Sequence, residues 1–290
     1  MVTPPEGITR VVLVVIDGVR ADAVPLFGMP HLERLMARGA WSIAARTVTP
    51  SVTAAAMGSL LTGVQPTTHG LSTDRFCWPR PKGPLDPLPR VLGRAGVPSQ
   101  AHLAKVPRAY RKLAEGFARL VGISHATLQG DSAREIVAAA EASGRARHAG
   151  LHLHHWPDAD RAGHAEGWTS RAYAAALREI DTALGALVQL TEACQDDDTL
   201  FLVLADHGGG GKDFRNHDSA HPHDRRIPLV LAGPQVQPGR LADGYSLLDV
   251  PATVAWALGA EVPEGWHGRP ITEAFVTLPD VATSAMAIAC

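Results

Sequence analysis

The feature that most constrains the fold is a set of short, uninterrupted apolar runs rich in β-branched residues. The three clearest are Val11–Ile16, Leu200–Ala205 and Ile227–Ala232, and two weaker ones are Pro98–Leu103 and Gly150–His155. Such runs are typical of strands buried on both faces, as in parallel sheets, whereas strands with one wet face alternate apolar and polar residues. We therefore expect a mostly parallel sheet that is covered on both sides.

Helical patterns lie between these runs. Apolar periodicity, capping residues and alanine content predict helices at Pro30–Arg38, Thr53–Leu61, Asp131–Ala142, Thr169–Ala193 and Leu247–Leu258. Strands that alternate with helices predict an open, doubly wound α/β sheet with helices on both faces. The 290 residues suit a single domain, residues 1–290, with minimal loops and no large cap domain. Five prolines predict a loop at Phe76–Pro89, and residues 72–130 are the best place for a small inserted cap.

The composition excludes several other classes of protein. Hydrophobic residues make up 46% of the chain and charged residues 19%, which is enough for a large core and excludes disorder for most of the chain. The formal net charge of -2 argues against the basic face of a nucleic-acid-binding protein. No apolar run reaches the roughly 18 residues of a membrane span, and the N-terminus lacks the basic region of a signal peptide. We expect a cytoplasmic protein that acts on a small molecule; its oligomeric state stays open.

Acidic side chains directly follow two of the predicted strands. Asp17 follows the first apolar run, and Asp206 and His207 follow the most apolar run, just before four consecutive glycines. Because ligands bind at the carboxyl ends of strands in open α/β sheets, these side chains are placed to ligate a metal. Taken alone, Asp17 would suit a turn or a helix cap equally well.

Two further segments carry reactive or ligating side chains. Ser51 and Thr53 lie where a helix is predicted to begin, and the free N–H groups there favour anions, although the same hydroxyls suit plain capping. Asp160 and His164 are four residues apart, in what we expect to be a loop after a strand. One carboxylate and one imidazole at short spacing suit Zn²⁺, which takes nitrogen and oxygen ligands.

Taken together, these segments resemble the alkaline phosphatase superfamily, in particular its type I phosphodiesterase/nucleotide pyrophosphatase-like branch. The resemblance covers nearly the whole chain, from Val11 to about Ile271. The matching motifs are Val-Ile-Asp17-Gly-Val-Arg, Thr53 nine residues before Thr62-Gly63 with Pro66-Thr-Thr-His69-Gly70 after it, Asp160-Arg-Ala-Gly-His164, Asp206-His207-Gly208, and His217 ten residues before Ile227-Pro-Leu-Val-Leu-Ala-Gly-Pro234. Each motif alone is modest, but their joint occurrence is highly specific.

The resemblance implies a metal-dependent hydrolase of phosphate esters, with phosphodiesters or pyrophosphates preferred. It implies two divalent metal ions, and the mixed histidine and aspartate ligands favour Zn²⁺, with Mn²⁺ as the alternative. By the same resemblance, two sets of side chains hold these ions: Asp160, His164 and His217 in one, and Asp17, Asp206 and His207, with the Thr53 oxygen, in the other. Thr53 would be the catalytic nucleophile and form a phosphothreonine that water then hydrolyses. A threonine hydroxyl is a poor nucleophile, and metal coordination activates it.

One position departs from the family pattern. Phosphodiesterase relatives usually carry an Asn three residues after the nucleophile, which donates to a phosphoryl oxygen, but this chain has Ala56 there. Loss of such a donor costs about 10²–10³ in rate. The donor is either absent or supplied by Arg20, Arg75 or Lys105, or the substrate carries a different charge.

Competing residues exist for two of the assignments. Ser51 is a second hydroxyl in the nucleophile segment, but the spacing to Thr62-Gly63 favours Thr53. His221 and His223 compete with His217 as the last ligand, and the spacing to the following strand favours His217.

Other activities remain as alternatives. The segment Pro50-Ser-Val-Thr53 resembles that of phosphonoacetate-type phosphonate hydrolases, and a phosphomonoesterase would use the same residues. Phosphotransfer of the isomerase type, as in cofactor-independent phosphoglycerate mutase, is a further alternative. That relative carries a large inserted domain, for which this chain has little room. The sulfatase motif Cys-x-Pro-x-Arg has only a displaced near-match at Cys77-Trp-Pro-Arg80. A metal-binding protein without catalysis would bind both ions and turn over no ester.

A further histidine group lies in a predicted strand. His152 and His154 share one face of that strand, while His155 points to the other face, because side chains alternate along a strand. The pair predicts a polar strand face, and His155 could touch a substrate near Asp160.

Overall fold

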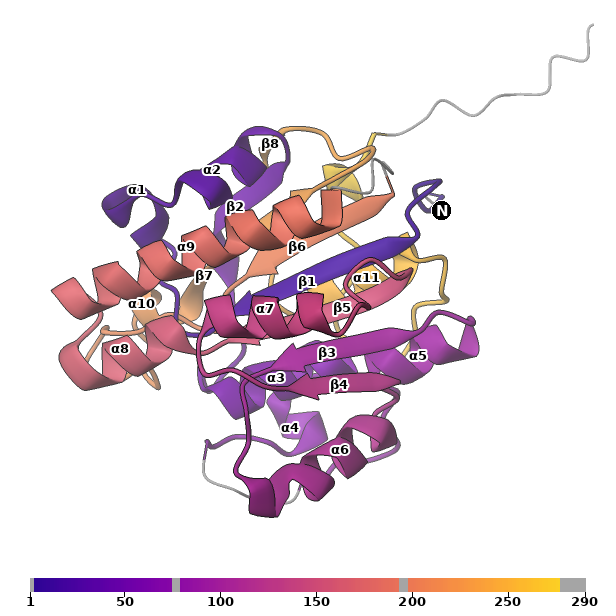
Figure 1. Cartoon of the computed structure of the whole chain (residues 1–290), viewed down its shortest axis with the longest axis horizontal. Coiled ribbons are helices and arrows are strands. Elements are labelled where there is room, and N and C mark those ends of the chain that lie inside the picture. The colour runs from indigo at the N-terminus through magenta and orange to yellow at the C-terminus, as the bar shows by residue number, and fades with distance from the viewer. Residues whose placement is uncertain (1–2, 75–78, 193–197, 277–290) are drawn as a thin grey trace, which may run out of the picture.

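The computed structural model describes residues 3–74, 79–192 and 198–276. In this part of the chain an eight-stranded sheet has the order β4-β3-β5-β1-β6-β7-β2-β8 (Figure 1). The strands are β1 (Arg10–Ile16), β2 (Ala40–Arg46), β3 (Ser99–Leu103), β4 (His125–Leu128), β5 (Gly150–Trp156), β6 (Thr199–Leu204), β7 (Arg226–Ala232) and β8 (Gly239–Arg240). Every residue of the central strand β1 is buried, as its uninterrupted apolar run predicts.

Most neighbouring strands run parallel, as expected, but β7 does not. It pairs antiparallel with both β6 and β2, so the parallel direction expected for Ile227–Ala232 is wrong, although the strand exists. The connection explains the difference. Between β6 and β7 the chain forms a loop and the short helix α10 (Pro222–Arg225), without a crossover helix, so it re-enters the sheet at the edge where it left.

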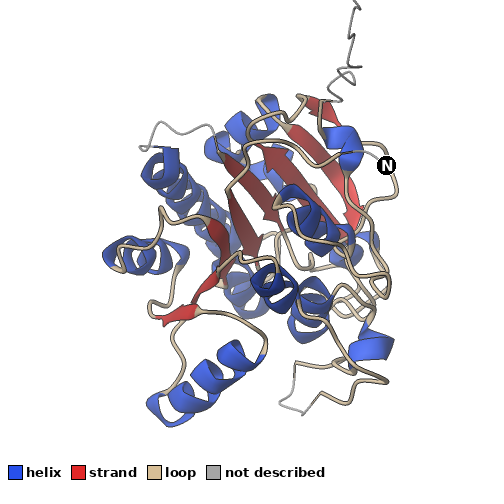
Figure 2. Cartoon of the chain, turned by 90° about the vertical axis from the view of Figure 1, so that its right-hand side faces the viewer, coloured by secondary structure: helices blue, strands red, loops and turns tan. Residues whose placement is uncertain are grey.

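Helices cover both faces of the sheet (Figures 1 and 2). They are α1 (Ala23–Phe27), α2 (Pro30–Ala37), α3 (Thr53–Thr62), α4 (Pro66–His69), α5 (Leu88–Arg94), α6 (Arg111–Leu120), α7 (Ala133–Ala142), α8 (Asp158–Glu166), α9 (Arg171–Glu192), α10 and α11 (Asp249–Ala257), with 3₁₀ turns η1 (Arg108–Tyr110) and η2 (Thr272–Ala274). Helix α9 packs against α2, α7 and α8, while α3, α5 and α11 pack against one another. The predicted fold class, an open and mostly parallel α/β sheet, is confirmed.

The local predictions differ from the structure in several places. The helix α8 replaces the loop expected around Asp160: Pro157 precedes it, and acids in its first turn stabilise the positive end of the helix dipole. The strands β2, β4 and β8 are missing from the predicted set. The sequence of β2, Ala-Trp-Ser-Ile-Ala-Ala-Arg, contains a single β-branched residue. The predicted capping box of α7 is present in part: the Ser132 hydroxyl accepts from the Glu135 N–H at 3.4 Å, but the Glu135 carboxylate accepts from the Asp131 N–H at 2.7 Å rather than from that of Ser132.

The stretch considered for an inserted cap contributes to the sheet itself. Within residues 79–130, β3 and β4 extend the sheet at one edge, and α6 lies against β4 (Figure 1). Of the loop predicted at Phe76–Pro89, residues 79–87 have neither helix nor strand, Leu88 and Pro89 begin α5, and residues 76–78 lie outside the described residues. Among the helices of the described residues, none has the length and apolar character needed to cross a membrane.

Candidate metal centre

Two buried acids meet at the carboxyl ends of neighbouring strands. Since β1 and β6 are parallel neighbours, Asp17 and Asp206, which follow them, lie at one edge of the sheet, with 5% and 0% of their surface exposed. The Asp206 carboxylate accepts from the N–H groups of Gly18 at 3.2 Å and His207 at 2.9 Å. These bonds fix the carboxylate against the loop that carries Asp17.

The Nε2 atom of His207 is the centre of a first group of candidate ligands. It lies 3.3 Å from Asp17 Oδ1 and 3.6 Å from Asp206 Oδ2. The Thr53 hydroxyl oxygen lies 3.1 Å from the same nitrogen and 3.4 Å from Asp17 Oδ1. The structure therefore brings together the four residues that the family pattern groups around one ion.

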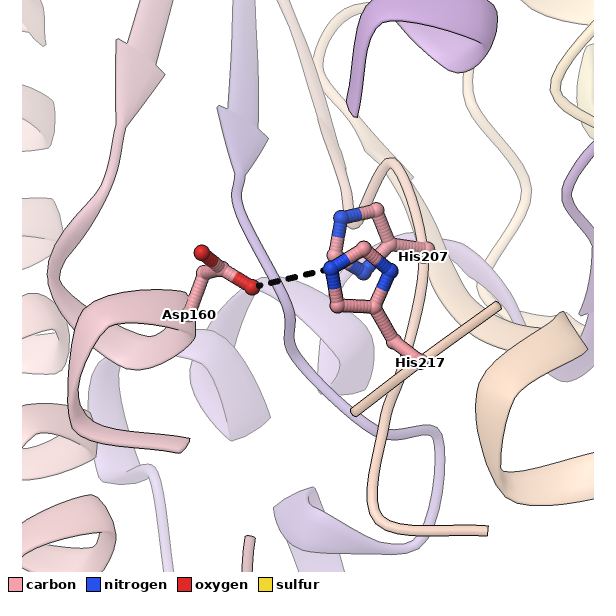
Figure 3. A group of neighbouring side chains, drawn as sticks. All are labelled: Asp160, His207 and His217. Atoms are coloured by element: carbon pink, nitrogen blue, oxygen red, sulfur yellow. Dashed lines mark ion pairs between the residues drawn. The ribbon is translucent and has the colours of Figure 1, made fainter. Parts of the chain in front are cut away.

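A second group consists of Asp160, His164 and His217. The Nε2 atoms of the two histidines lie 3.4 and 3.7 Å from Asp160 Oδ1 and 3.1 Å from each other. Asp160 and His164 are one turn apart on α8, which places them on one face of the helix. The rings of His207 and His217 stack with centroids 3.9 Å apart, so the two groups adjoin, and Figure 3 shows Asp160 facing both histidines.

Backbone carbonyls set the tautomer of all three histidines. The Nδ1 atoms of His164, His207 and His217 lie 2.7–2.8 Å from the carbonyl oxygens of Arg215, Gly208 and Ser51, respectively. A carbonyl can only accept, so each Nδ1 carries a proton, and Nε2 is the ring atom that faces the centre of the site. This arrangement is typical of imidazoles that ligate a metal.

The donor set fits divalent cations. The Nε2 atoms of His164 and His217 lie 3.1 Å apart, a spacing that suits two ligands of one ion. Ligand atoms on tetrahedral Zn²⁺ lie about 3.3 Å apart, given metal–ligand distances of about 2.0–2.1 Å. The buried oxygens Asp160 Oδ1 and Asp206 Oδ2 have no hydrogen-bond partner. Asp160, His207 and His217 offer ligand atoms within 4.8 Å of one another, as do Asp17, Asp206 and His207.

The electrostatics of the site also favour added positive charge. Burial, and then the Asp17 carboxylate, raise the pKa of Asp160 to about 8 and that of Asp206 to about 6. Burial lowers the pKa of His207, but Asp206 and Asp17 outweigh it and raise the pKa to about 10. Burial, followed by the neighbouring His207, lowers the pKa of His217 to about 4, which keeps that imidazole neutral. A cation among the carboxylates would relieve their repulsion.

The two hydroxyls of the nucleophile segment have different surroundings. Thr53 is the first residue of α3, and its hydroxyl faces Asp17 and His207. Ser51 is buried, and its hydroxyl donates to the His217 carbonyl, while its own carbonyl accepts from His217 Nδ1. Ser51 therefore holds a candidate ligand, and only Thr53 of the pair offers its oxygen to the site.

The competing histidines lie outside both groups. His223 Nε2 lies 3.2 Å from an Arg20 Nη2 and 3.7 Å from Asp22 Oδ2, and His221 Nδ1 accepts from the His223 N–H. Of the three histidines that compete for the last position, His217 is the one beside Asp160. The sulfatase-like string begins at Cys77, which lies outside the described residues.

None of the described candidates replaces the missing Asn. Ala56 is fully buried in α3. The Arg20 guanidinium is held by Asp22 through bonds of 2.8 and 2.6 Å, and Lys105 forms an exposed ion pair with an aspartate. Arg75 lies outside the described residues.

Two residues of the site lie outside the sequence motifs, and the sequence predicts only a packing role for them. Trp168 is buried, its indole N–H donates to the Gly18 carbonyl at 2.8 Å, and its ring contacts those of His164 and His217 at centroid distances of 5.2 and 5.8 Å. The Tyr173 hydroxyl donates to the same carbonyl at 3.0 Å. Both side chains hold the loop after β1 in place through hydrogen bonds to the Gly18 carbonyl. Neither belongs to a linear sequence motif.

Two more side chains alter the charge around the nucleophile. His155 Nε2 lies 3.5 Å from Asp17 Oδ2, on the strand face opposite to His152 and His154, as the alternation predicts. Asp74 Oδ1 accepts from the Ala54 N–H at 2.9 Å. This N–H is one of the donors at the start of α3 that we expect to bind a phosphoryl oxygen, and here it is bonded to a carboxylate instead.

Family models match most of the chain. The type I phosphodiesterase/nucleotide pyrophosphatase model matches residues 11–86, and the metalloenzyme superfamily model matches residues 112–262, just over half of the chain. The chain belongs to the alkaline phosphatase superfamily, a superfamily of metalloenzymes. The predicted family is thereby confirmed, and membership implies binding of divalent metal.

Curated relatives match parts of the chain. GPI ethanolamine phosphate transferase 1 of Gibberella zeae is 27% identical over 152 residues, which are 44% of this chain and 15% of that protein. The 2,3-bisphosphoglycerate-independent phosphoglycerate mutase of Serratia proteamaculans is 27% identical over 120 residues (40% and 22%). The choline-sulfatase of Rhizobium meliloti is 34% identical over 114 residues (38% and 22%). The chain thus spans less than a quarter of the length of these relatives.

Solved structures share the fold over most of the chain. The phosphonate monoester hydrolase of Silicibacter pomeroyi superposes with a TM-score of 0.69 at 18% identity, covering 90% of this chain and 75% of that one. An inactive threonine-to-alanine variant of murine ectonucleotide pyrophosphatase/phosphodiesterase 5, in complex with AMP, superposes with a TM-score of 0.71 at 15% identity, covering 92% and 99%.

Proposed function

We propose that this protein is a metal-dependent hydrolase of phosphate esters, with phosphodiesters or pyrophosphates as preferred substrates and Thr53 as the nucleophile. The observation that carries the proposal is the position of the Thr53 hydroxyl at the start of α3, 3.1 Å from His207 Nε2 and 3.4 Å from Asp17 Oδ1. The names of the curated relatives support the substrate class, because they denote enzymes that act on phosphate or sulfate groups.

Two sets of side chains would hold two divalent ions, which we propose to be Zn²⁺: Asp160, His164 and His217 in one, and Asp17, Asp206 and His207, with the Thr53 oxygen, in the other. When bound, these ions supply Lewis-acid stabilisation of phosphoryl oxygens and lower the pKa of the attacking hydroxyl. The Thr53 oxygen attacks phosphorus, and the bond from phosphorus to the leaving alcohol oxygen breaks. Water then attacks the phosphothreonine, releases the phosphate product and restores Thr53.

The α3 N-terminus would contribute part of the phosphoryl binding. Its free N–H groups face the region beyond Thr53 and favour negative charge. Because Ala56 replaces the Asn, these N–H groups would supply a larger share of the hydrogen bonds to the phosphoryl group. The Asp74 carboxylate must leave the Ala54 N–H before a phosphoryl oxygen can accept from it.

A substrate panel tests the proposal. The metal-free protein is reconstituted with Zn²⁺ or Mn²⁺ and assayed with p-nitrophenyl monoester, diester, phosphonate and sulfate substrates. We expect turnover that depends on added metal and is fastest with a diester. Fastest turnover of a phosphonate ester would favour the phosphonate hydrolase instead. Two bound ions without turnover of any ester would contradict the proposal and indicate a metal-binding role.

A further inference from the structure

An apolar cavity of about 470 Å³ runs along α3, and its lining on this helix begins at Ala54, the residue after Thr53. Ala54, Met57 and Leu61 line it, and their spacing of three and four residues places them on one face of the helix. Thr53 is not among the lining residues, but Met57, which lines the cavity, lies one helical turn after it, so the cavity approaches the hydroxyl to within about one turn of α3. At about 1.5 Å per residue, it extends about 10 Å along the helix from Ala54 to Leu61.

The opposite walls are also apolar. They come from the proline-rich loop, through Pro81 and Pro84, and from α6, through Phe117 and Leu120. Phe117 is 43% exposed and Leu120 is 60% exposed. Large apolar side chains that share one concave surface are characteristic of ligand-binding sites rather than of scattered surface residues.

The few polar groups of the lining offer little to a charged ligand. The Thr62 hydroxyl is already bonded to the Gly58 carbonyl at 2.7 Å, and His69 is buried against the Ser59 hydroxyl at 3.0 Å. Arg90 is the single charged side chain among the lining residues that the structure describes. The cavity therefore suits a hydrocarbon group, since a buried polar group would lack partners.

We propose that this cavity binds the apolar organic group, aryl or alkyl, of an ester whose phosphorus lies at Thr53. The inference rests on the proposed function for the position of the phosphorus, and it adds the substrate class: phosphoric or phosphonic esters with a hydrophobic substituent. Specificity would then come from burial of that substituent along α3 and α6.

A chain-length series tests the cavity by binding alone. Zn²⁺-loaded protein is titrated calorimetrically with n-alkylphosphonic acids from methyl to octyl. We expect the Kd to fall by about 4-fold for each methylene, the ratio that corresponds to about 0.8 kcal/mol per buried CH₂. In the Phe117→Ala/Leu120→Ala variant the dependence on chain length is lost, while methylphosphonic acid binds as in wild type.

The matched control is Leu113→Ala. Leu113 is also on α6 and 48% exposed, but it does not line the cavity, so this variant should keep the wild-type dependence. A flat series in wild type, or a series unchanged in the double variant, would overturn the proposal. Sedimentation supplies a further test. If wild type is a dimer, and Leu113→Ala and the double variant weaken that dimer equally, then a second copy of the chain covers this surface, which would also overturn the proposal.

The two proposals fail separately. Protein that hydrolyses no ester but shows the chain-length dependence would refute the proposed function and leave the cavity assignment standing. Protein that hydrolyses phosphodiesters with a flat binding series would refute the cavity assignment alone.

Discussion

Three buried histidines should make the fold sensitive to acid. His102 on β3 and His152 and His154 on β5 lie on one face of the sheet, with ring centroids 6.0 Å (His102–His152) and 4.6 Å (His102–His154) apart. Both ring nitrogens of His102 and the Nδ1 atoms of the other two have no hydrogen-bond partner. Each ring is at most 1% exposed. A proton on any of them would be a buried charge beside other imidazoles.

Burial, and then neighbouring histidines, lower the pKa of His102 to about 3. Burial, the largest cause, also lowers that of His152 to about 4 and that of His154 well below its usual value. In the unfolded chain each imidazole titrates near 6.5. Below that pH the unfolded chain takes up protons that the folded chain does not, so stability falls from about pH 6.5 downward until the folded pKa is reached. Between pH 7 and pH 5, His102 and His152 should each cost about 2 kcal/mol of unfolding free energy.

Replacement of His102 by leucine isolates this effect. We expect the wild-type unfolding free energy to fall by about 2 kcal/mol more than that of His102→Leu between pH 7 and pH 5, in urea titrations of both Zn²⁺-loaded proteins. Acid effects common to both proteins, such as metal loss, cancel in the difference. The exposed His148, replaced by glutamine, is the control and should behave as wild type. A wild-type minus His102→Leu difference that is the same at both pH values would refute the reasoning.

Three further predictions concern the metal centre. Trp168→Phe removes the indole hydrogen bond to the loop after β1, so unfolding free energy should fall by about 1 kcal/mol in urea titrations, and metal should be lost more readily to a chelator. Ser51→Ala removes the hydroxyl that bonds the His217 carbonyl; metal affinity should weaken by about 10–100-fold in chelator competition, with turnover at saturating metal retained, whereas abolished turnover would point to a catalytic hydroxyl. Asp74→Asn removes a carboxylate from the start of α3 and should lower KM for an anionic ester by about 2–5-fold at low salt, an effect that salt should reduce; an unchanged KM would place Asp74 outside the substrate path.

Much of the sheet, and the positions of several candidate ligands, could be predicted because they depend on local sequence. Uninterrupted apolar runs mark strands that are buried on both faces, and the acids that end these runs, Asp17 and Asp206, lie at the sheet edge for the same reason. The strand β2 could not be predicted in this way. Its alanine-rich sequence has a low intrinsic β-propensity, and pairing with neighbouring strands holds it in the sheet. The direction of β7 depends on the length and path of a connection, which hydrophobic pattern alone does not encode.

The rest of the site depends on contacts between distant segments. Trp168 donates a hydrogen bond to the carbonyl of Gly18, which lies 150 positions earlier in the chain. Asp74 accepts a hydrogen bond from the Ala54 N–H at the start of α3. His155 could be placed on the correct strand face by alternation, but its distance from Asp17 depends on the register between β5 and β1. Asp160 and His164 lie 3.4 Å apart, and their spacing of four residues explains this proximity only because α8 is a helix rather than the expected loop.

The most direct test of the account is the turnover and metal content of Thr53→Ala, measured beside Thr53→Ser. The account predicts two bound ions per chain in both variants, a loss of turnover of about 10³-fold or more in Thr53→Ala, and substantial activity in Thr53→Ser, which keeps a hydroxyl at the same position. Near-wild-type turnover in Thr53→Ala with its metal retained would contradict the assignment of Thr53 as the nucleophile.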